Sequence, residues 1–151
     1  MENTKIEYAG FWKRFSASII DAVVIVFFTV PILYLINNLV NNSYFGGDYE
    51  RYEESFMISY YTWSFYLLII RWAYFAGMEC SPLKGTIGKI AVGIYVTDTN
   101  GNNITFGQAT GRFFGKMISG LILYIGFMMA GFTDKKQALH DMMSNCLVLT
   151  K

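Results

Sequence analysis

Residues 10–21 read Gly-Phe-Trp-Lys-Arg-Phe-Ser-Ala-Ser-Ile-Ile-Asp, and the chain after them is almost wholly apolar as far as Leu39. Asp21 therefore lies inside a predicted transmembrane helix, seven residues after Arg14 at its start. Seven helical residues make about two turns, so both side chains project from one face, about 10 Å apart along the axis. An ionisable group inside a membrane helix costs roughly 2.5–3.5 kcal/mol on insertion scales. The residues that offset this cost for Asp21 define the candidate site.

The composition indicates an integral membrane protein. Of 151 residues, 54% are hydrophobic and only 15% are charged, whereas about a quarter of the residues of a soluble domain are charged. The apolar residues form long runs, which predicts a single membrane domain over residues 1–151 with membrane lipids as its surroundings. The net charge of +1 comes without a dense basic patch, so no nucleic-acid partner is expected. The first apolar run contains Asp21 and lacks a small-x-small cleavage site, which favours a retained anchor over a signal peptide.

The apolar runs predict an all-α integral membrane protein with two transmembrane helices and a third, Gly-rich segment. The predicted parts are helix 1 at about 15–39, an outer loop at 41–54, helix 2 at about 56–78, a cytoplasmic loop and hairpin at 79–106, segment 3 at about 107–132 and a tail at 133–151. Pro31 is expected to kink helix 1. Lys13 and Arg14 precede helix 1 whereas the outer loop is acidic, which predicts a multi-pass protein of the cytoplasmic membrane with a cytoplasmic N-terminus.

The third segment leaves two alternatives open. Basic residues flank it on both sides, so both of its ends favour the cytoplasm. It is therefore either a tilted third span or a re-entrant hairpin, and re-entrant backbone needs shielding by protein or water. Asn100-Gly101 ahead of residues 103–106 predicts a short cytoplasmic β-hairpin. The tail is read as a short amphipathic helix.

Depth along the helices pairs Asp21 with Arg71. Each residue lies about six residues, or about 9 Å, from the cytoplasmic end of its predicted helix. On antiparallel neighbours the two charges then fall at one level, and an Asp21–Arg71 ion pair is expected. The pair is either a structural device or part of a proton or cation site, since burial raises the pKa of a carboxylate and a nearby arginine lowers it. His140, next to Asp141, either relays protons or lies in an exposed turn.

The residue types do not support an enzyme. Gly88-Lys89 lacks the rest of a phosphate-binding loop, and the single histidine has no partner nucleophile. Cys80 and Cys146 form neither a CxxC pair nor a zinc pattern. We therefore expect no catalytic residues, no metal site and no cofactor.

An ordered set of short motifs resembles a known family. Arg14-x6-Asp21 begins it, Gly85–Lys89 and Gly93–Asp98 follow, and Ala138-Leu139-His140-Asp141 ends it. Together these motifs resemble the RDD family of prokaryotic membrane proteins, over nearly the whole chain. The resemblance implies that the family's one arginine and two aspartates are Arg14, Asp21 and Asp141. It further implies that Asp141 folds back to Arg14, which would bridge the two aspartates. Arg71 is not part of the family pattern, and Ser144-Asn145-Cys146 departs from it.

The family resemblance implies a bacterial inner-membrane protein, with monovalent cation/proton antiport reported for some members. In that reading Asp21 is the carrier carboxylate, Arg14 or Arg71 tunes it and Asp141 gates the cytoplasmic face. Two or three helices do not enclose a pathway, so an exchanger would have to be a homo-oligomer. The alternative is a non-catalytic membrane adaptor or assembly factor with a structural charged triad and a partner surface at Gly85–Phe106.

Overall fold

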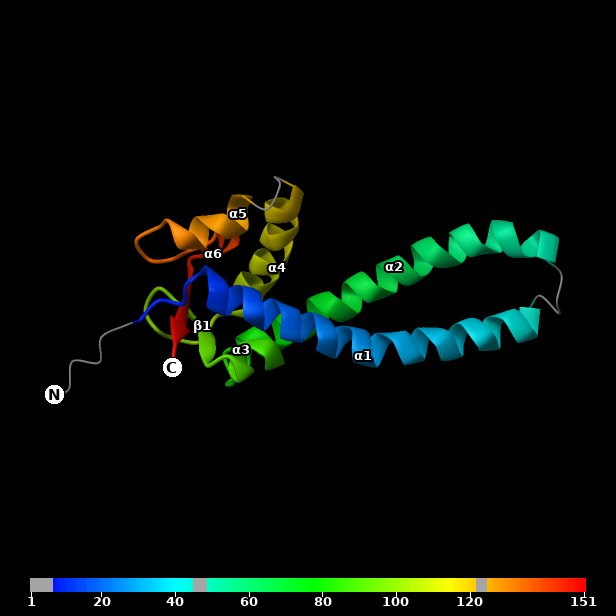
Figure 1. The fold of residues 1–151 in the computed structure, drawn as a ribbon, viewed down its shortest axis with the longest axis horizontal. Coiled ribbons are helices and arrows are strands. Elements are labelled where there is room, and N and C mark those ends of the chain that lie inside the picture. The colour runs from blue at the N-terminus through cyan, green and yellow to red at the C-terminus, as the bar shows by residue number, and fades with distance from the viewer. Residues whose placement is uncertain (1–6, 45–48, 122–124) are drawn as a thin grey trace. The chain divides into compact units, whose positions relative to one another are not determined.

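The computed structural model describes residues 7–44, 49–121 and 125–151, and its backbone is mostly helical (Figure 1). The chain divides into two compact units. The first joins the N-terminal part, through Asp21, to Trp72–Lys151, and the second contains Ala22–Arg71. Helices α1 (Phe11–Tyr44) and α2 (Tyr49–Cys80) each contribute to both units.

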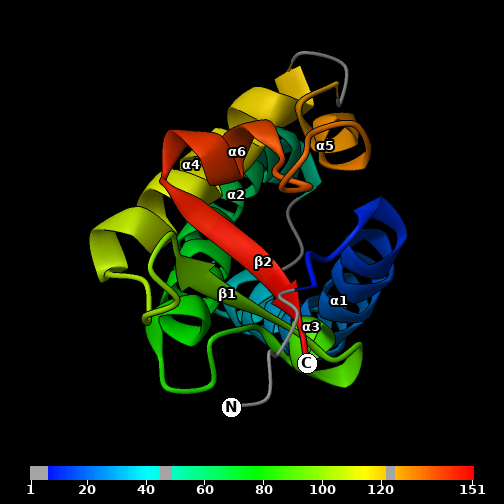
Figure 2. The ribbon, with the colours of Figure 1, turned by 90° about the vertical axis from the view of Figure 1, so that its left-hand side faces the viewer.

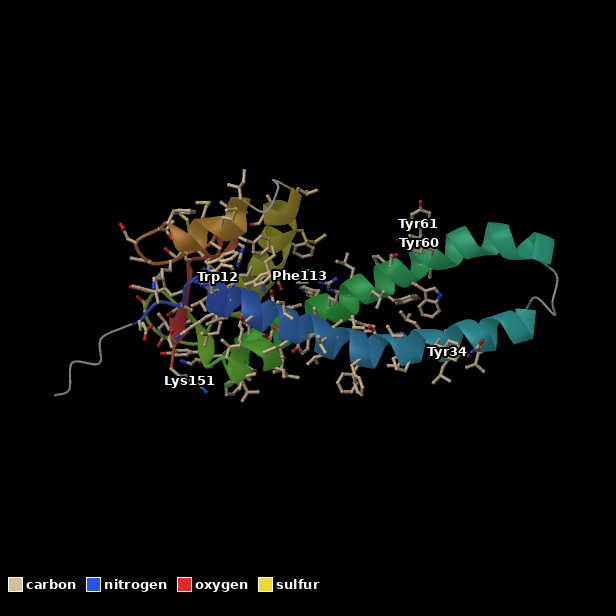
Figure 3. The ribbon with its side chains drawn as sticks, viewed as in Figure 1. Trp12, Tyr34, Tyr60, Tyr61, Phe113 and Lys151 are labelled. Carbon is tan, nitrogen blue, oxygen red and sulfur yellow. The ribbon has the colours of Figure 1, made fainter. Side chains whose placement is uncertain are left out.

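The second unit consists of the outer parts of α1 and α2, which run in opposite directions (Figure 1). Large side chains project from both helices, among them Tyr34, Tyr60 and Tyr61 (Figure 3), which are 67%, 58% and 65% exposed. A helix that is apolar all round and not buried in protein is typical of a membrane span. This surface is suited to lipid.

One helical stretch of the described residues is by itself long and apolar enough to cross a membrane, Phe11–Ile36. Helix α4 (Phe106–Leu121) meets the same criterion only together with α5 (Ile125–Met128) and η1 (Met129–Gly131), and this pair is bent by 117°. Span and re-entrant loop both fit such a bend, and residues 122–124 lie outside the described residues. The second predicted span, helix 2, forms as α2, and its crossing stays a prediction.

The predicted boundaries of the first two helices are too narrow. Helix α1 begins at Phe11 and continues past Pro31 to Tyr44, and α2 already begins at Tyr49. Much of the expected outer loop 41–54 is therefore helical, and its residues 45–48 lie outside the described residues. The polar residues that suggested a loop are compatible with helix because a long helix can extend beyond the apolar layer into water.

The protein is mostly helical as predicted, and the first unit also contains a small antiparallel sheet. Strand β1 (Ile94–Asp98) pairs with β2 (Cys146–Thr150) from the end of the chain, with Val96 opposite Val148 (Figure 2). The N-terminal segment adds to the other edge of β2, since the Ala9 amide donates to the Val148 carbonyl over 2.9 Å. Both ends of the chain thus meet in one sheet, around a core of Ala9, Ile94, Val96, Cys146 and Val148.

The predicted β-hairpin is wrong, although its turn exists. The Asp98 carboxylate accepts hydrogen bonds from the amides of Asn100 and Asn102, each over 2.8 Å, and Gly101 takes a left-handed φ of 85°. The chain then does not return along β1. Ile104 instead enters the core with 2% of its surface exposed, and α4 begins at Phe106.

The tail does not form the predicted amphipathic helix. It contains the five-residue helix α6 (Leu139–Met143) and then β2. Asn145 takes a left-handed φ of 51°, which ends the helical turn and redirects the chain into the strand. The run Cys146–Thr150 is almost fully buried, and a short apolar run of this kind does not reveal by periodicity whether it is strand or helix.

Helix α4 packs closely on α6 through its glycines. A Cβ at Gly115 would lie 2.9 Å from Cβ of His140, and a Cβ at Gly111 would lie 3.1 Å from Oγ of Ser144. The small-xxx-small spacing of these two glycines therefore serves packing inside the protein. Gly126 of α5 completes the arrangement, since its Cβ would lie 2.6 Å from Oγ of Ser119.

Gly115→Ala should destabilise the protein because the new methyl group would overlap His140. The expected loss is about 2 kcal/mol of unfolding free energy, the usual cost of overpacking. Gly120→Ala on the same helix is the control, because a Cβ there meets nothing within 4 Å and alanine is the better helix former. Thermal unfolding of the detergent-purified protein measures both, and equal melting temperatures would contradict the close α4–α6 contact.

Candidate functional site

Asp21 lies in a cage of neutral hydrogen-bond donors. Oδ1 accepts from the Tyr74 hydroxyl over 2.9 Å and from the Gly88 amide over 2.8 Å. Oδ2 accepts from the Thr86 hydroxyl over 2.6 Å. The side chain is almost completely buried, with 2% of the residue exposed. Hydrogen bonds from several donors stabilise a buried carboxylate without a cationic partner.

The same bonds attach helix α3 (Ile87–Ala91) to α1 and α2. Thr86 occupies the N-cap position but makes no side-chain bond to its own helix. The first free amides of α3 bind elsewhere: Ile87 donates to the Tyr74 hydroxyl over 3.1 Å, and Gly88 donates to Asp21. Asp21 and Tyr74 thus supply from other helices the acceptors that a helix start needs.

A second carboxylate, Glu79 near the end of α2, is surrounded by three cations. Lys89 lies 2.5 Å and Lys116 3.2 Å from Oε1, and Arg112 Nε lies 3.0 Å from Oε2. Glu79 and Arg112 are each only 1% exposed. Burial of so many charges is tolerated only when they are paired with good geometry.

Arg112 extends this cluster to the tail. Its Nη2 lies 2.9 Å from Oδ1 of Asp141, whose other oxygen is bound by Arg14 Nη1 and by the Ala138 amide. His140 Nε2 lies 3.3 Å from Oδ1 of the same carboxylate. One buried guanidinium thus connects α2, α4 and α6.

We call this set the ion network. Its members are Arg14, Glu79, Lys89, Arg112, Lys116 and Asp141. Four basic side chains face two carboxylates, so the network carries excess positive charge when every member is ionised. Truncation of one member of a buried pair typically costs 3–5 kcal/mol, because the other charge is left unpaired.

Burial and charge shift several pKa values in the network region, among them those of Lys89, His140 and Asp141. Burial lowers the pKa of Lys89 to about 7, against the opposing effect of Glu79. Burial likewise lowers the pKa of His140 to about 3, so this imidazole is neutral at pH 7. Burial alone would raise the pKa of Asp141, but Arg112 and Arg14 outweigh it and hold that pKa well below its usual range.

The structure brings together some of the sequence-predicted site residues and separates others. The contact between Arg14 and Asp141 that the family resemblance implied is present, and His140 lies buried beside it rather than in an exposed turn. Arg14 does not bridge to Asp21. Its remaining donors bind the carbonyls of Ala9 over 2.9 Å and Lys136 over 2.6 Å.

The expected Asp21–Arg71 pair is not formed. Asp21 has its three neutral donors, and Arg71 is exposed with no ion pair among the described residues. The depth argument failed because α2 presents Tyr74, not Arg71, to Asp21. Arg71 and Tyr74 are three positions apart on α2, so their side chains point about 60° apart around the helix axis. A rotation of α2 by that amount decides which of the two faces Asp21.

Sequence reasoning missed the centre of the network. Neither Glu79 nor Lys89 was among the predicted site residues, although the structure buries both. A usable signal was the i, i+4 spacing of Arg112 and Lys116 in a segment otherwise apolar. Two cations on one face of such a helix require a carboxylate nearby.

Asp21→Asn should lower the unfolding free energy by about 2 kcal/mol, because an amide offers one acceptor where the carboxylate offers two. Ser16→Asn, at an exposed position of the same helix, is the matched control. Thermal unfolding in detergent compares the two variants with the wild type. An unchanged melting temperature for Asp21→Asn would show that the three hydrogen bonds add nothing to stability.

Stability should fall as the pH drops below about 6.5, because the unfolded chain protonates His140 there and the folded protein does so only near pH 3. The slope for one proton approaches about 1.4 kcal/mol per pH unit. Below about pH 4 Asp141 adds to the loss, since its stabilising effect is present above the unfolded-state pKa and disappears as that carboxylate protonates. In His140→Gln the melting temperature should stay nearly constant between pH 6.5 and pH 4.5, and a wild-type slope in that variant would assign the effect to another group.

Comparison with known proteins agrees with the motifs. The model of the RDD family matches residues 8–145. The uncharacterized protein YxaI of Bacillus subtilis (strain 168) is 33% identical over 148 residues, covering 95% of this chain and 97% of YxaI. The uncharacterized membrane protein YteJ of the same strain is 27% identical over 148 residues, covering 94% of this chain and 80% of YteJ. No solved structure matches. The chain belongs to the RDD family and is a membrane protein.

Proposed function

We propose that this protein is a non-catalytic membrane adaptor or assembly factor whose charged family residues hold its own fold together. One observation carries the proposal: Arg14, Asp21 and Asp141 all have their partners inside the first unit. A carboxylate that carries ions must alternate between a proton and a cation. Asp21 instead serves as the acceptor for the start of α3.

The surroundings of Asp21 also leave little room for an ion. A Cβ at Gly88 would lie 2.8 Å from the carboxylate carbon of Asp21, so the α3 backbone packs directly against it. The three donors are the hydroxyls of Tyr74 and Thr86 and an amide, which satisfy a carboxylate but are not cation ligands while they donate. This geometry favours the structural role over the carrier role.

The partner surface that fits the proposal is the loop 99–103, a continuously exposed part of the segment Gly85–Phe106. Every residue of this loop is exposed, and Asp98 holds its backbone through two amide hydrogen bonds. A preorganised polar loop loses little conformational entropy when a partner binds.

The orientation belongs to the proposal as well. We place α1 and α2 across the cytoplasmic membrane, with the N-terminus and the ion network on the cytoplasmic side. Lys13 and Arg14 lie in the first turn of α1, Lys84 and Lys89 follow α2, and the positive-inside rule assigns such ends to the cytoplasm.

Monovalent cation/proton exchange by a homo-oligomer is the second candidate, and one observation favours it. The buried Lys89 lies 2.5 Å from Glu79, and burial lowers the pKa of Lys89 to about 7. A proton shared by such a pair can be released near neutral pH. In this alternative the carrier would be the Lys89–Glu79 pair rather than Asp21.

Proton flux in vesicles separates the two candidates. We expect purified wild type in proteoliposomes to leave a pH gradient intact on addition of sodium, potassium or lithium, because all three family side chains are held internally. Dissipation of the gradient by the wild type and its loss in a folded Lys89→Met variant would overturn the adaptor proposal. Everted membrane vesicles with Lys89→Met at matched expression provide the same comparison in the native membrane.

Site-specific photo-crosslinking tests the partner surface in the same membranes. A photoreactive residue at Asn100 should form a crosslink to one defined protein, and the same residue at the exposed Lys135 should not. Absence of a crosslink from every position of the loop 99–103 would contradict the adaptor proposal.

A further inference from the structure

Helix α4 is amphipathic, but its polar face is buried and its apolar face is exposed. Its buried face carries mostly small or charged side chains, with Ala109, Arg112 and Ser119 each at most 1% exposed, and one large apolar residue, Phe113, at 7%. Its exposed face carries five large apolar residues, with the exposed Gly107 and Gly111 beside them. We call this face the apolar stripe, and its members are Phe106 (50% exposed), Phe114 (48%), Met117 (45%), Ile118 (44%) and Leu121 (83%).

The apolar surface continues beyond α4. Gly126 packs α5 against Ser119, and Phe127 lies against His140, whereas Ile125 and Met128 of α5 and Phe132 after η1 are exposed. Ile125 is 57%, Met128 51% and Phe132 85% exposed. Contiguous exposed apolar surface of this kind marks an interaction site for a protein or a membrane.

A second copy of the chain fits this surface poorly. Helices associate within membranes through small residues that let their backbones approach. Two glycines of α4 are already used inside the protein, since Gly115 contacts α6 and Gly111 contacts Ser144 directly after it. The five members of the apolar stripe are all large and apolar, and Gly107 at the start of α4 is an exposed small residue beside them, so the stripe offers few of the groups that would align a partner helix.

The direction of α4 adds a second argument. Within the first unit, α4 runs crosswise to the direction of the first turns of α1, Phe11–Asp21, although the two helices lie apart (Figures 1 and 2). These turns begin the stretch Phe11–Ile36, which is long and apolar enough to cross a membrane. A helix lying across a membrane span is oriented along the membrane surface.

Basic side chains border the apolar surface. Lys116 keeps 22% of its side chain exposed, with Nζ 4.6 Å from the centre of the Phe75 ring. Lys135 and Lys136 are exposed directly after Phe132, with Asp134 as the acidic residue between. Apolar residues flanked by lysines are typical of helices that lie in the interface of an anionic membrane.

We infer that α4, α5 and η1 lie in the plane of the membrane interface, with the apolar stripe on the acyl chains and the neighbouring lysines at anionic lipid headgroups. The buried members of the ion network then lie on the protein side of α4, shielded from lipid, whereas Lys116 reaches the interface. The inference rests on the membrane location of the chain and holds for an adaptor and for an exchanger alike.

Depth measurements test this placement in the full-length protein reconstituted in vesicles of phosphatidylglycerol and phosphatidylcholine. In a Cys80→Ser, Cys146→Ala background, a single fluorophore is attached at Phe106→Cys, Phe114→Cys or Leu121→Cys. Nitroxides at a shallow or a deep acyl carbon quench it according to depth. Asn102→Cys in the exposed polar loop is the control, and each variant is used only if its thermal unfolding remains cooperative.

We expect the three stripe positions to be quenched by the shallow nitroxide at nearly equal depths, about 5–10 Å below the headgroups, and several-fold more strongly than Asn102→Cys. A helix that crosses the membrane would instead separate Phe106 from Leu121 by as much as about 22 Å in depth. That gradient would overturn the inference. Weak quenching at all three positions, with disulfide crosslinks between copies at Leu121→Cys, would assign the stripe to a protein interface and would also overturn it.

Headgroup preference tests the lysines separately. With the fluorophore at Met128→Cys, nitroxide-labelled phosphatidylglycerol should quench about twofold more than nitroxide-labelled phosphatidylcholine. The combination Lys135→Gln and Lys136→Gln should bring that ratio close to one while the depth stays the same. A ratio of one with both lysines present would remove anionic lipid from the inference.

Discussion

The buried guanidinium of Arg112 is the interaction on which the rest of the first unit depends. A charge that is 1% exposed must be neutralised locally, and Arg112 achieves this with Glu79 of α2 on one side and Asp141 of α6 on the other. Each carboxylate then recruits further cations, Lys89 to Glu79 and Arg14 to Asp141. Because every partner comes from a different element, the pairing requirement of one side chain positions the ends of α1, α2 and α4 and holds the tail against them. The tail is held a second time by its strand β2, which pairs with β1 and with the N-terminal segment.

The two aspartates of the family pattern solve the problem of burial in different ways. Asp141 is held by charge, through two arginines, whereas Asp21 is held by neutral donors from Tyr74, Thr86 and Gly88. A hydroxyl or amide neutralises no charge, but several of them replace the hydration that the carboxylate loses on burial. Asp21 therefore fixes the position of α3, and α3 in turn delivers Lys89 to Glu79. Helix α3 therefore links the Asp21 site to the ion network, and the Arg14 bridge between the two aspartates that the family pattern suggested is not formed.

Sequence reasoning recovered what depends on single residues and missed what depends on distant pairing. The position of Asp21 inside an apolar helix required a buried site, and the family motifs brought Asp141 to Arg14. Strand β2 could not be predicted in this way. Its partner β1 lies about fifty residues earlier, and the apolar run Cys146–Thr150 does not show by its sequence with which part of the chain it pairs. The Asp21–Arg71 expectation failed for a related reason. Helix length gives depth along the axis accurately, but the rotation that chose Tyr74 over Arg71 is set by contacts with α3, which periodicity does not contain.

Helix α4 shows what a hydrophobic period does and does not establish. The period groups Phe114, Ile118 and Leu121 on one face and Arg112 and Ser119 on the other, whatever surrounds the helix. In a soluble protein the first face would be buried, and here the second face is buried. Ion pairing decides which face of α4 is buried, because Arg112 needs the carboxylates of α2 and α6, and these lie in the protein interior. Because the face with Arg112 is buried, the opposite, apolar face of α4 points away from the protein interior. Its exposure therefore follows from ion pairing rather than from the hydrophobic effect. The same logic explains why Lys116, at the edge between the faces, keeps one side on Glu79 and leaves the rest of its side chain partly exposed.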